Sequence, residues 1–130
     1  MLIGTPYLDH GRTREGVDCY GHVFLEYQEA GIDLPSFSSQ YPDPLSKDRE
    51  TIAGLICGNI LLFNEVHEED AEPLDVILFK VFGVPSHVAI FDKPNWMRNV
   101  DTNAGVVRER YDSPRWGSRI VGFYRYAGES

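Results

Sequence analysis

The part of the sequence that most restricts the fold runs from Pro73 to Tyr126. It contains short segments rich in valine, isoleucine, phenylalanine and tyrosine, which are separated by the turn-forming stretches GVP, DKPN, TNAG and DSPRWG. β-Branched and aromatic residues favour strands, whereas glycine, proline, asparagine and aspartate favour turns. The pattern therefore predicts an antiparallel sheet, with strands at residues 74–82, 86–91, 96–101, 106–111 and 118–126.

A helix is predicted soon after the N-terminus, behind a loop at residues 2–16. Asp18 is a typical N-terminal cap and Gly31 a typical helix stop. Between them, apolar residues recur at the intervals of three and four that place side chains on one helix face, at Tyr20, Val23, Phe24, Tyr27 and Ala30. The sequence therefore predicts an amphipathic helix that runs to Ala30.

A second helix is predicted from about Lys47 to Phe63, although Gly54 and Gly58 weaken the pattern. The acidic stretch 64–73 is expected to be a solvated connector to the sheet. Helices followed by an antiparallel sheet make an α+β fold. Because no linker divides the chain, residues 1–130 are predicted to form a single domain.

The composition excludes several kinds of partner. The chain has 12 lysines and arginines against 20 aspartates and glutamates, a formal net charge of -8. Nucleic acids and anionic membranes bind basic surfaces, so neither is expected as the main partner. The longest apolar stretch, LICGNILLF, is too short to span a bilayer. The sequence has no CxxC, HxxxH or HExxH motif and no glycine-rich phosphate loop, so no metal or cofactor is expected. The N-terminus has no signal-peptide pattern.

Cys19 follows Asp18 and stands in the first turn of the first predicted helix. Unpaired backbone N–H groups and the helix dipole favour a thiolate at such a position. Cys57 lies on an apolar stretch, where a thiol is expected to be inert. The position therefore makes Cys19 a candidate nucleophile, with a structural buried thiol as the alternative.

A histidine and an asparagine stand on two strands of one predicted hairpin. With a turn of three or five residues, His87 pairs directly opposite Asn99, whereas a turn of four residues would separate them. In the favourable register Asp101 lies on the same face, one diagonal step away. An imidazole beside an amide or carboxylate supplies a base and a group that holds its tautomer, as an activated cysteine requires. A half-buried structural histidine and a strand-ending asparagine remain the alternatives, and spacing alone does not decide between them.

Four motifs stand in a fixed order along the chain: GTPY at 4–7, DCYGHV at 18–23, LDVILF at 74–79 and HVAIF at 87–91. In these motifs, and in GIDLP at 31–35, the sequence resembles the NlpC-type cell-wall peptidases, papain-like cysteine hydrolases that act on bacterial peptidoglycan. The third polar residue of that family follows its histidine by about twelve positions, where Asn99 stands here. The resemblance extends from Gly4 to the end of the chain.

The resemblance implies a papain-like NlpC-type fold, in which the nucleophile begins a helix that packs on an antiparallel sheet. It implies that Cys19 attacks an amide of a peptidoglycan stem peptide, most characteristically the bond between D-γ-glutamate and the diamino acid. His87 would then act as base and Asn99 would orient it. The backbone N–H of Cys19 and the hydroxyl of Tyr7 would stabilise the oxyanion, and Asp18 would contact the substrate amine as well as cap the helix.

The sequence departs from the family pattern at two positions near the nucleophile. Tyr20 replaces a serine and is expected to alter recognition of a free substrate amine. His22 replaces a leucine; it is either a hydrogen-bonded core residue or a second base that reaches the Cys19 thiol from one turn away.

A finer resemblance, to the branch found in bacteriophage tails, rests on the aromatic residue after the cysteine and on the ending WGSRIVGFYRY. It implies a tail-tip component that aids cell-wall penetration, with other tail-tip proteins as partners. Its expected location is the virion, or the cytoplasm of the infected host before assembly. Two alternatives remain: a structural tail protein without activity, and another papain-like amidase.

Overall fold

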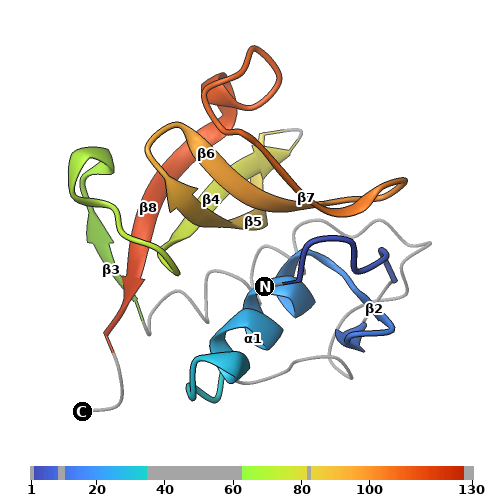
Figure 1. Ribbon diagram of the computed structural model, residues 1–130. Coiled ribbons are helices and arrows are strands. Elements are labelled where there is room, and N and C mark those ends of the chain that lie inside the picture. Colours follow the sequence, from blue (N-terminus) through green and yellow to red (C-terminus); the bar gives the residue numbers. More distant parts are fainter. Residues whose placement is uncertain (1, 9–10, 35–62, 82, 128–130) are drawn as a thin grey trace.

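The structure is a computed structural model that describes residues 2–8, 11–34, 63–81 and 83–127, and it consists of a helix packed on a six-stranded antiparallel sheet (Figure 1). In spatial order the strands are β3 (Phe63–Val66), β8 (Ile120–Tyr126), β4 (Val76–Val81), β5 (Val84–Lys93), β6 (Trp96–Asp101) and β7 (Gly105–Arg110). The predicted α+β class, with a helix-start cysteine on an antiparallel sheet, is confirmed.

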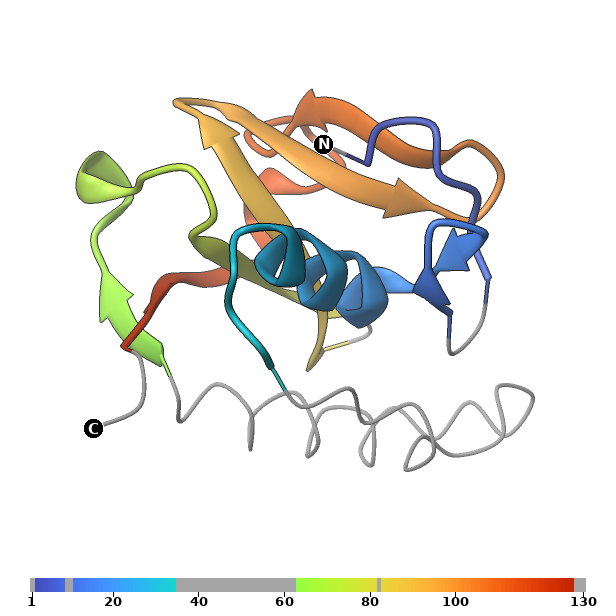
Figure 2. The same cartoon turned by 60° about the horizontal axis from the view of Figure 1, so that its bottom comes forward.

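Helix α1 (Cys19–Glu29) lies across one face of the sheet and packs mainly on β5 and β6 (Figure 2). It is preceded by a small hairpin of β1 (Arg12–Thr13) and β2 (Gly16–Val17), and two 3-10 turns, η2 (Glu68–Asp70) and η3 (Gly117–Arg119), lie ahead of β4 and β8. The predicted helix is therefore present, but its buried surface is wider than the predicted stripe. His22 and Glu26 are buried as well, whereas Ala30 is exposed.

Both faces of the central strands are covered. On the side of α1, one apolar cluster joins the helix to β4 and β5, and contains Tyr20, Val23, Tyr27, Leu34, Phe63, Val76, Leu78, Val88 and Ile90. On the other face a second cluster contains Ile77, Phe79, Ala89, Phe91, Met97, Tyr111, Trp116 and Phe123. Alternate residues of β4 and β5 thus enter different cores, which explains their nearly continuous apolar sequence.

Several boundaries differ from the sequence predictions. The stretch 64–73 is more than a solvated connector, because its first residues continue from Phe63 as β3 and pair with β8. Residues 12–17, predicted as loop, form the β1–β2 hairpin. The last predicted strand begins at Ile120, after the 3-10 turn. The second predicted helix, up to residue 62, lies outside the described residues, as does Cys57.

The register of the β5–β6 hairpin also differs from the prediction. The pairs are Ile90 with Arg98, Phe91 with Met97 and Lys93 with Trp96, with a bulge between Phe91 and Lys93. Direct opposition of His87 and Asn99 would instead have placed Val88 opposite Arg98. The prediction was therefore wrong by two residues on the open side of the bulge, an even shift that keeps His87 and Asn99 on their predicted shared face.

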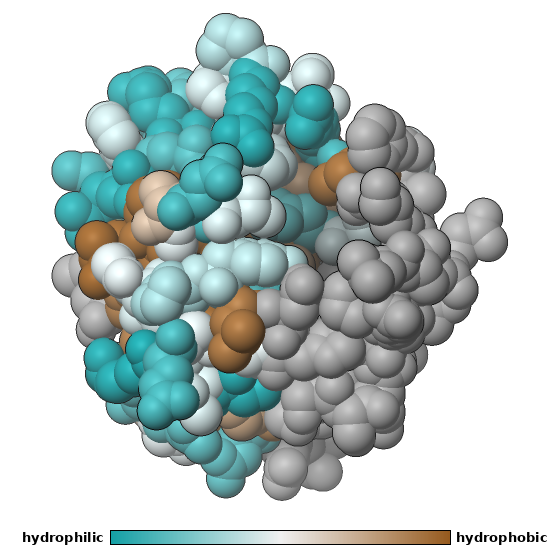
Figure 3. All heavy atoms as spheres, turned by 90° about the vertical axis from the view of Figure 1, so that its right-hand side faces the viewer, coloured by the Kyte–Doolittle hydropathy of each residue, from teal (hydrophilic) through white to brown (hydrophobic). Residues whose placement is uncertain are grey.

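On the face shown in Figure 3 the described residues are largely hydrophilic, with hydrophobic residues in small separate groups. The exposed large hydrophobic residues in the described ranges are Ile3, Leu8 and Val121. No helix in these ranges has the length and apolar character needed to cross a membrane.

A buried ion pair joins α1 to the sheet. Arg98 of β6 binds the Glu26 carboxylate through two nitrogens, at 2.8 Å from Nη2 to Oε1 and 2.9 Å from Nε to Oε2. His22 Nε2 also hydrogen-bonds Glu26, and Asp92 binds the far side of the Arg98 guanidinium. Burial opposes the charge on Glu26, but the bonds from His22 and Arg98 outweigh it and lower the pKa of this carboxyl from 4.5 to about 2.

We expect Glu26→Gln to lower the free energy of unfolding by roughly 2 kcal/mol at neutral pH, because it removes one of the two carboxylates that neutralise the buried Arg98 guanidinium. Since the pKa of Glu26 is lowered on folding, its contribution is complete above pH 4.5 and is lost as the pH falls towards 2. Urea unfolding at neutral and acidic pH measures both effects.

Glu29→Gln provides the matched control, because Glu29 lies on the same helix but pairs at the surface with Arg14. It should change the free energy of unfolding little. Equal losses in the two variants, or an unchanged acid sensitivity in Glu26→Gln, would contradict a stabilising role for the buried pair.

Candidate active site

The start of α1 is held by Asp18, which is the N-cap residue as predicted. Its Oδ1 accepts a hydrogen bond from the backbone N–H of Gly21 at 2.6 Å. A Cβ at Gly21 would lie 2.0 Å from the carbonyl oxygen of Gly11, so glycine is required for the loop before β1 to approach the helix. That approach lets Arg12 donate to Asp18 at 2.8 Å. Cys19 therefore begins a helix whose first turn is anchored on two sides.

The Cys19 thiol lies where β5 and β6 separate. Their ladder begins at the turn and ends at Ile90 and Arg98. Val88 precedes Ile90 by two residues on β5 and lies farther from the turn. Its backbone makes a hydrogen bond with the thiol. The sulfur thus contacts the strand immediately after His87, at a position beyond the end of the ladder.

Burial sets the charge state of the thiol. Desolvation, followed by the negative charge of Asp18, raises the pKa of Cys19 to about 12. Hydrogen bonds from the backbone of Val88 on β5, and of Tyr20 at the helix start, lower it by less. The sequence predicted that the helix start favours a thiolate. The backbone does lower the pKa of Cys19 as predicted, but the overall pKa is raised, so the predicted thiolate is not favoured.

His87 and Asn99 are in contact despite the shifted register. His87 Nε2 lies 2.6 Å from Asn99 Oδ1, a diagonal contact between β5 and β6. Desolvation lowers the pKa of His87 to about 4, although the Asn99 bond and the charge of Glu109 act in the opposite direction. Together with the raised pKa of Cys19, this leaves the thiol and the imidazole both uncharged at neutral pH.

Asn99 has further partners that the sequence analysis did not identify. Its Nδ2 donates to Glu109 Oε2 at 2.8 Å, and Glu109 Oε1 accepts from Trp116 Nε1 at 3.2 Å. The Trp116 ring stacks on His87, with centroids 5.1 Å apart and planes at 17°. The sequence alone could not show this contact, because Glu109 and Asn99 are diagonal neighbours that share a face only in the observed β6–β7 register, in which Asn99 pairs with Val107.

The two alternative residues lie elsewhere. Asp101, the other candidate partner of His87, accepts hydrogen bonds from the backbone N–H groups of Asn103 and Ala104 and closes the β6–β7 turn. His22 is fully buried, and its Nε2 forms a hydrogen bond with the Glu26 carboxylate. The structure therefore places His22 in the core, as a hydrogen-bonded histidine.

The remaining predicted site residues differ in their exposure. Tyr7 is half-buried and forms a backbone bridge with Val17, two residues before the nucleophile. Tyr20 is only 3% exposed and belongs to the core, with the Arg12 guanidinium 5.3 Å from its ring centroid. This burial argues against a direct part for the Tyr20 ring in recognition of the substrate amine. Asp18 is also buried, with Arg12 as its counter-ion.

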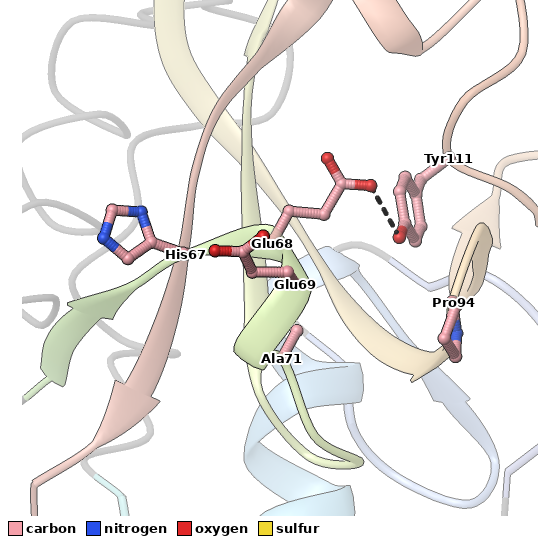
Figure 4. A pocket seen from close by; sticks show the side chains of 6 residues that line it. All are labelled: His67, Glu68, Glu69, Ala71, Pro94 and Tyr111. Atoms are coloured by element: carbon pink, nitrogen blue, oxygen red, sulfur yellow. Dashed lines mark hydrogen bonds between the residues drawn. The ribbon is translucent and has the colours of Figure 1, made fainter.

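A surface pocket of about 440 Å³ lies away from these residues (Figure 4). It is lined by residues near η2, by the β5–β6 turn and by the residue after β7: His67, Glu68, Glu69, Ala71, Pro94 and Tyr111. The Tyr111 hydroxyl donates to Glu68 across it at 3.1 Å. In the described ranges no group of three or more histidine, cysteine, aspartate or glutamate side chains is placed to hold a metal ion.

We expect the alkylation of Cys19 by iodoacetamide to accelerate steadily from about pH 5 to about pH 10, because the thiolate fraction grows with pH as long as the pH is below the raised pKa. The measurement uses a Cys57→Ser background, in which Cys19 is the sole thiol. A rate that is already constant between about pH 5 and pH 8 would instead indicate a thiolate–imidazolium pair.

Asp18→Asn tests the electrostatic cause. Asparagine also caps helices well, but it lacks the charge that raises the pKa of Cys19. Alkylation at neutral pH should become faster in this variant, with the helix retained. An unchanged rate would show that the charge of Asp18 does not act on the thiol.

Known proteins match this chain along most of its length. The model of the NlpC/P60 family matches residues 4–125. A curated relative, the probable endopeptidase NlpC of Escherichia coli, is 30% identical over 115 residues, which are 87% of this chain and 64% of the relative. The chain thus spans somewhat less than two thirds of that protein.

Solved structures share the fold at lower identity. An NlpC/P60 family protein from Bacillus cereus is 22% identical with a TM-score of 0.72, covering 97% of this chain and 37% of that one. Another solved structure is RipD of Mycobacterium tuberculosis, described as a non-catalytic NlpC/p60 domain protein adapted to peptidoglycan binding. It is 17% identical with a TM-score of 0.56, and the match covers 97% of this chain and 80% of RipD. With the family match over nearly its whole length, the chain belongs to the NlpC/P60 family.

Proposed function

We propose that the protein is a peptidoglycan hydrolase, a cysteine endopeptidase that cleaves stem-peptide amide bonds. The observation that carries this proposal is the His87–Asn99 hydrogen bond, on a strand whose next residue, Val88, contacts the helix-start Cys19, in a chain of the NlpC/P60 family. The curated relative in Escherichia coli is named a probable endopeptidase, which supports the same reaction class.

The proposed reaction follows from the hydrogen-bond pattern. Asn99 Oδ1 accepts from His87 Nε2–H, so the lone pair of the imidazole is on Nδ1. As the Cys19 sulfur attacks the carbonyl carbon, Nδ1 takes the thiol proton and then gives it to the leaving amine. The backbone N–H of Cys19, which no carbonyl within α1 can accept from, would stabilise the oxyanion, assisted by the hydroxyl of Tyr7. Water then hydrolyses the thioester, with His87 as base, and restores the thiol.

The neutral resting pair gives this mechanism a specific form. Because the pKa of Cys19 is raised and that of His87 is lowered, the ion pair costs free energy before substrate binds. The proton therefore moves as the carbon–sulfur bond forms, and bound substrate supplies the polar environment that the buried thiolate lacks.

Within this class we propose the amide between D-γ-glutamate and the diamino acid as the bond cleaved. The net charge of -8 provides no long-range attraction to an anionic wall, so recognition depends on short-range contacts or on partners that hold the protein at the wall. The aromatic Tyr20 and the ending WGSRIVGFYRY support a place in a phage tail tip, with other tail-tip proteins as those partners.

A second candidate is a binding or structural domain without turnover. The neutral Cys19–His87 pair favours it, since the thiol is not preactivated. RipD, the non-catalytic neighbour, gives it a precedent within the fold.

Digestion of purified peptidoglycan, with mass analysis of the fragments, tests the proposal. Wild-type protein should release fragments with new N-termini on the diamino acid, and Cys19→Ala should release none. Asn99→Ala should lower turnover by about tenfold or more, because His87 loses its orienting acceptor, whereas Asp101→Ala should change it little.

Other outcomes have distinct meanings. Release of intact stem peptides from the glycan would indicate an amidase. Binding to the wall without cleavage, for wild type and Cys19→Ala alike, would favour the non-catalytic candidate. A larger loss in Asp101→Ala than in Asn99→Ala would overturn the role of Asn99.

A further inference from the structure

We propose that Glu109 is a positioning residue that sets the orientation of the Asn99 amide and thereby selects the tautomer of His87. Its effect on turnover rests on the proposed function, whereas its effect on the tautomer does not.

The inference begins with a chain of contacts that closes on itself. His87 on β5 bonds Asn99 on β6 at 2.6 Å, Asn99 bonds Glu109 on β7 at 2.8 Å, and Glu109 bonds Trp116 at 3.2 Å. Trp116 returns to the beginning of the chain by stacking on the His87 ring. Four side chains from four separate segments therefore form one ring of contacts.

The direction of each hydrogen bond in this ring is determined by Glu109. An ionised carboxylate can only accept, so the atom of Asn99 that faces it must be the N–H donor, Nδ2. The carbonyl oxygen of the same amide then necessarily faces His87. Trp116 Nε1 is also solely a donor and occupies the second carboxylate oxygen.

The orientation of the Asn99 amide matters because the two tautomers of His87 have opposite capacities. With Asn99 Oδ1 as acceptor, His87 carries its proton on Nε2 and keeps Nδ1 free to act as base. If the amide turned over, Nδ2 would donate to Nε2, and the proton would be forced onto Nδ1. Such an imidazole could not accept the proton of Cys19.

Burial makes the selection effective. Asn99 is 1% exposed and Trp116 is 5% exposed, so water competes poorly for the amide. An amide can turn over with little steric change, and its carbon skeleton alone therefore does not select one orientation. The carboxylate of Glu109 distinguishes the two orientations of the Asn99 amide, because it can accept a hydrogen bond from Nδ2 but not from Oδ1.

The structure offers a variant that separates this role from general stability. Glu109→Gln is nearly isosteric, but glutamine has one acceptor oxygen for two donors, Asn99 Nδ2 and Trp116 Nε1. If its oxygen accepts from Trp116, its own N–H faces Asn99 and reverses the amide. Adding Trp116→Phe removes the competing donor and keeps an aromatic ring against His87, so the glutamine oxygen is then free to accept from Asn99.

The experiment is nitrogen-15 NMR of the histidine rings at neutral pH, where the lowered pKa leaves His87 uncharged. Two-bond proton–nitrogen correlations distinguish the two tautomers. Wild type should show the proton on Nε2, Glu109→Gln should shift His87 towards the Nδ1–H form, and Glu109→Gln with Trp116→Phe should return it to Nε2–H. The control is Asp112→Asn, which removes an exposed carboxylate near the end of the same strand and should change nothing.

Turnover on peptidoglycan should follow the tautomer, falling by about tenfold in Glu109→Gln and recovering partly in the double variant. The proposal would be overturned if folded Glu109→Gln kept the Nε2–H tautomer of His87. It would also be overturned if His87 did not return to the Nε2–H form in the double variant. Absence of turnover in every protein, with the tautomer shifting as expected, would instead refute the proposed function and leave the role of Glu109 intact. Glu109→Ala, in which Asn99 has no partner to set its amide, should give a mixture of tautomers and supplies a second test if Glu109→Gln does not fold.

Discussion

The buried pair of Glu26 and Arg98 is the interaction on which the geometry of the site depends. It joins the middle of α1 to β6, and Arg98 is also the residue at which the β5–β6 ladder ends. A buried carboxylate and guanidinium tolerate little displacement, because any separation leaves charges in a medium that solvates them poorly. The pair therefore determines where the helix starts relative to the separating strands, and so brings the Cys19 thiol to the backbone of Val88.

The same enclosure that positions the Cys19 thiol also suppresses its ionisation. Backbone N–H groups at the helix start favour a thiolate, but desolvation and the charge of Asp18 act more strongly in the opposite direction. Arg12 offsets part of that charge through its ion pair with Asp18. A thiol kept neutral in the resting protein is protected from oxidation, since the thiolate is the reactive form. Under the proposed mechanism, such a site would reach its reactive state only when substrate changes the environment of the sulfur.

Local sequence signals predicted the parts of this structure that local interactions determine. Asp18 caps the helix and β6 has the predicted bounds, because capping and strand propensity act over a few residues. The β5–β6 register could not be predicted, since it depends on a bulge, yet the two-residue error preserved the face and hence the His87–Asn99 contact. The pKa values were not accessible either, because desolvation depends on residues brought together from distant parts of the chain.

Glu109 and Trp116 show why the outer part of the site leaves no motif. They reach Asn99 and His87 from β7 and from the segment before η3, so no fixed spacing in the sequence relates them to the nucleophile. Their chemistry nonetheless bears on function. Buried polar groups cost free energy to desolvate, and apolar residues of similar volume often stabilise a core as well or better. A purely structural domain would gain little from a carboxylate, an amide, an imidazole and an indole N–H in one ring of contacts. A hydrolase gains the defined tautomer of its base, which makes the ring the strongest physical argument for catalysis over a structural role.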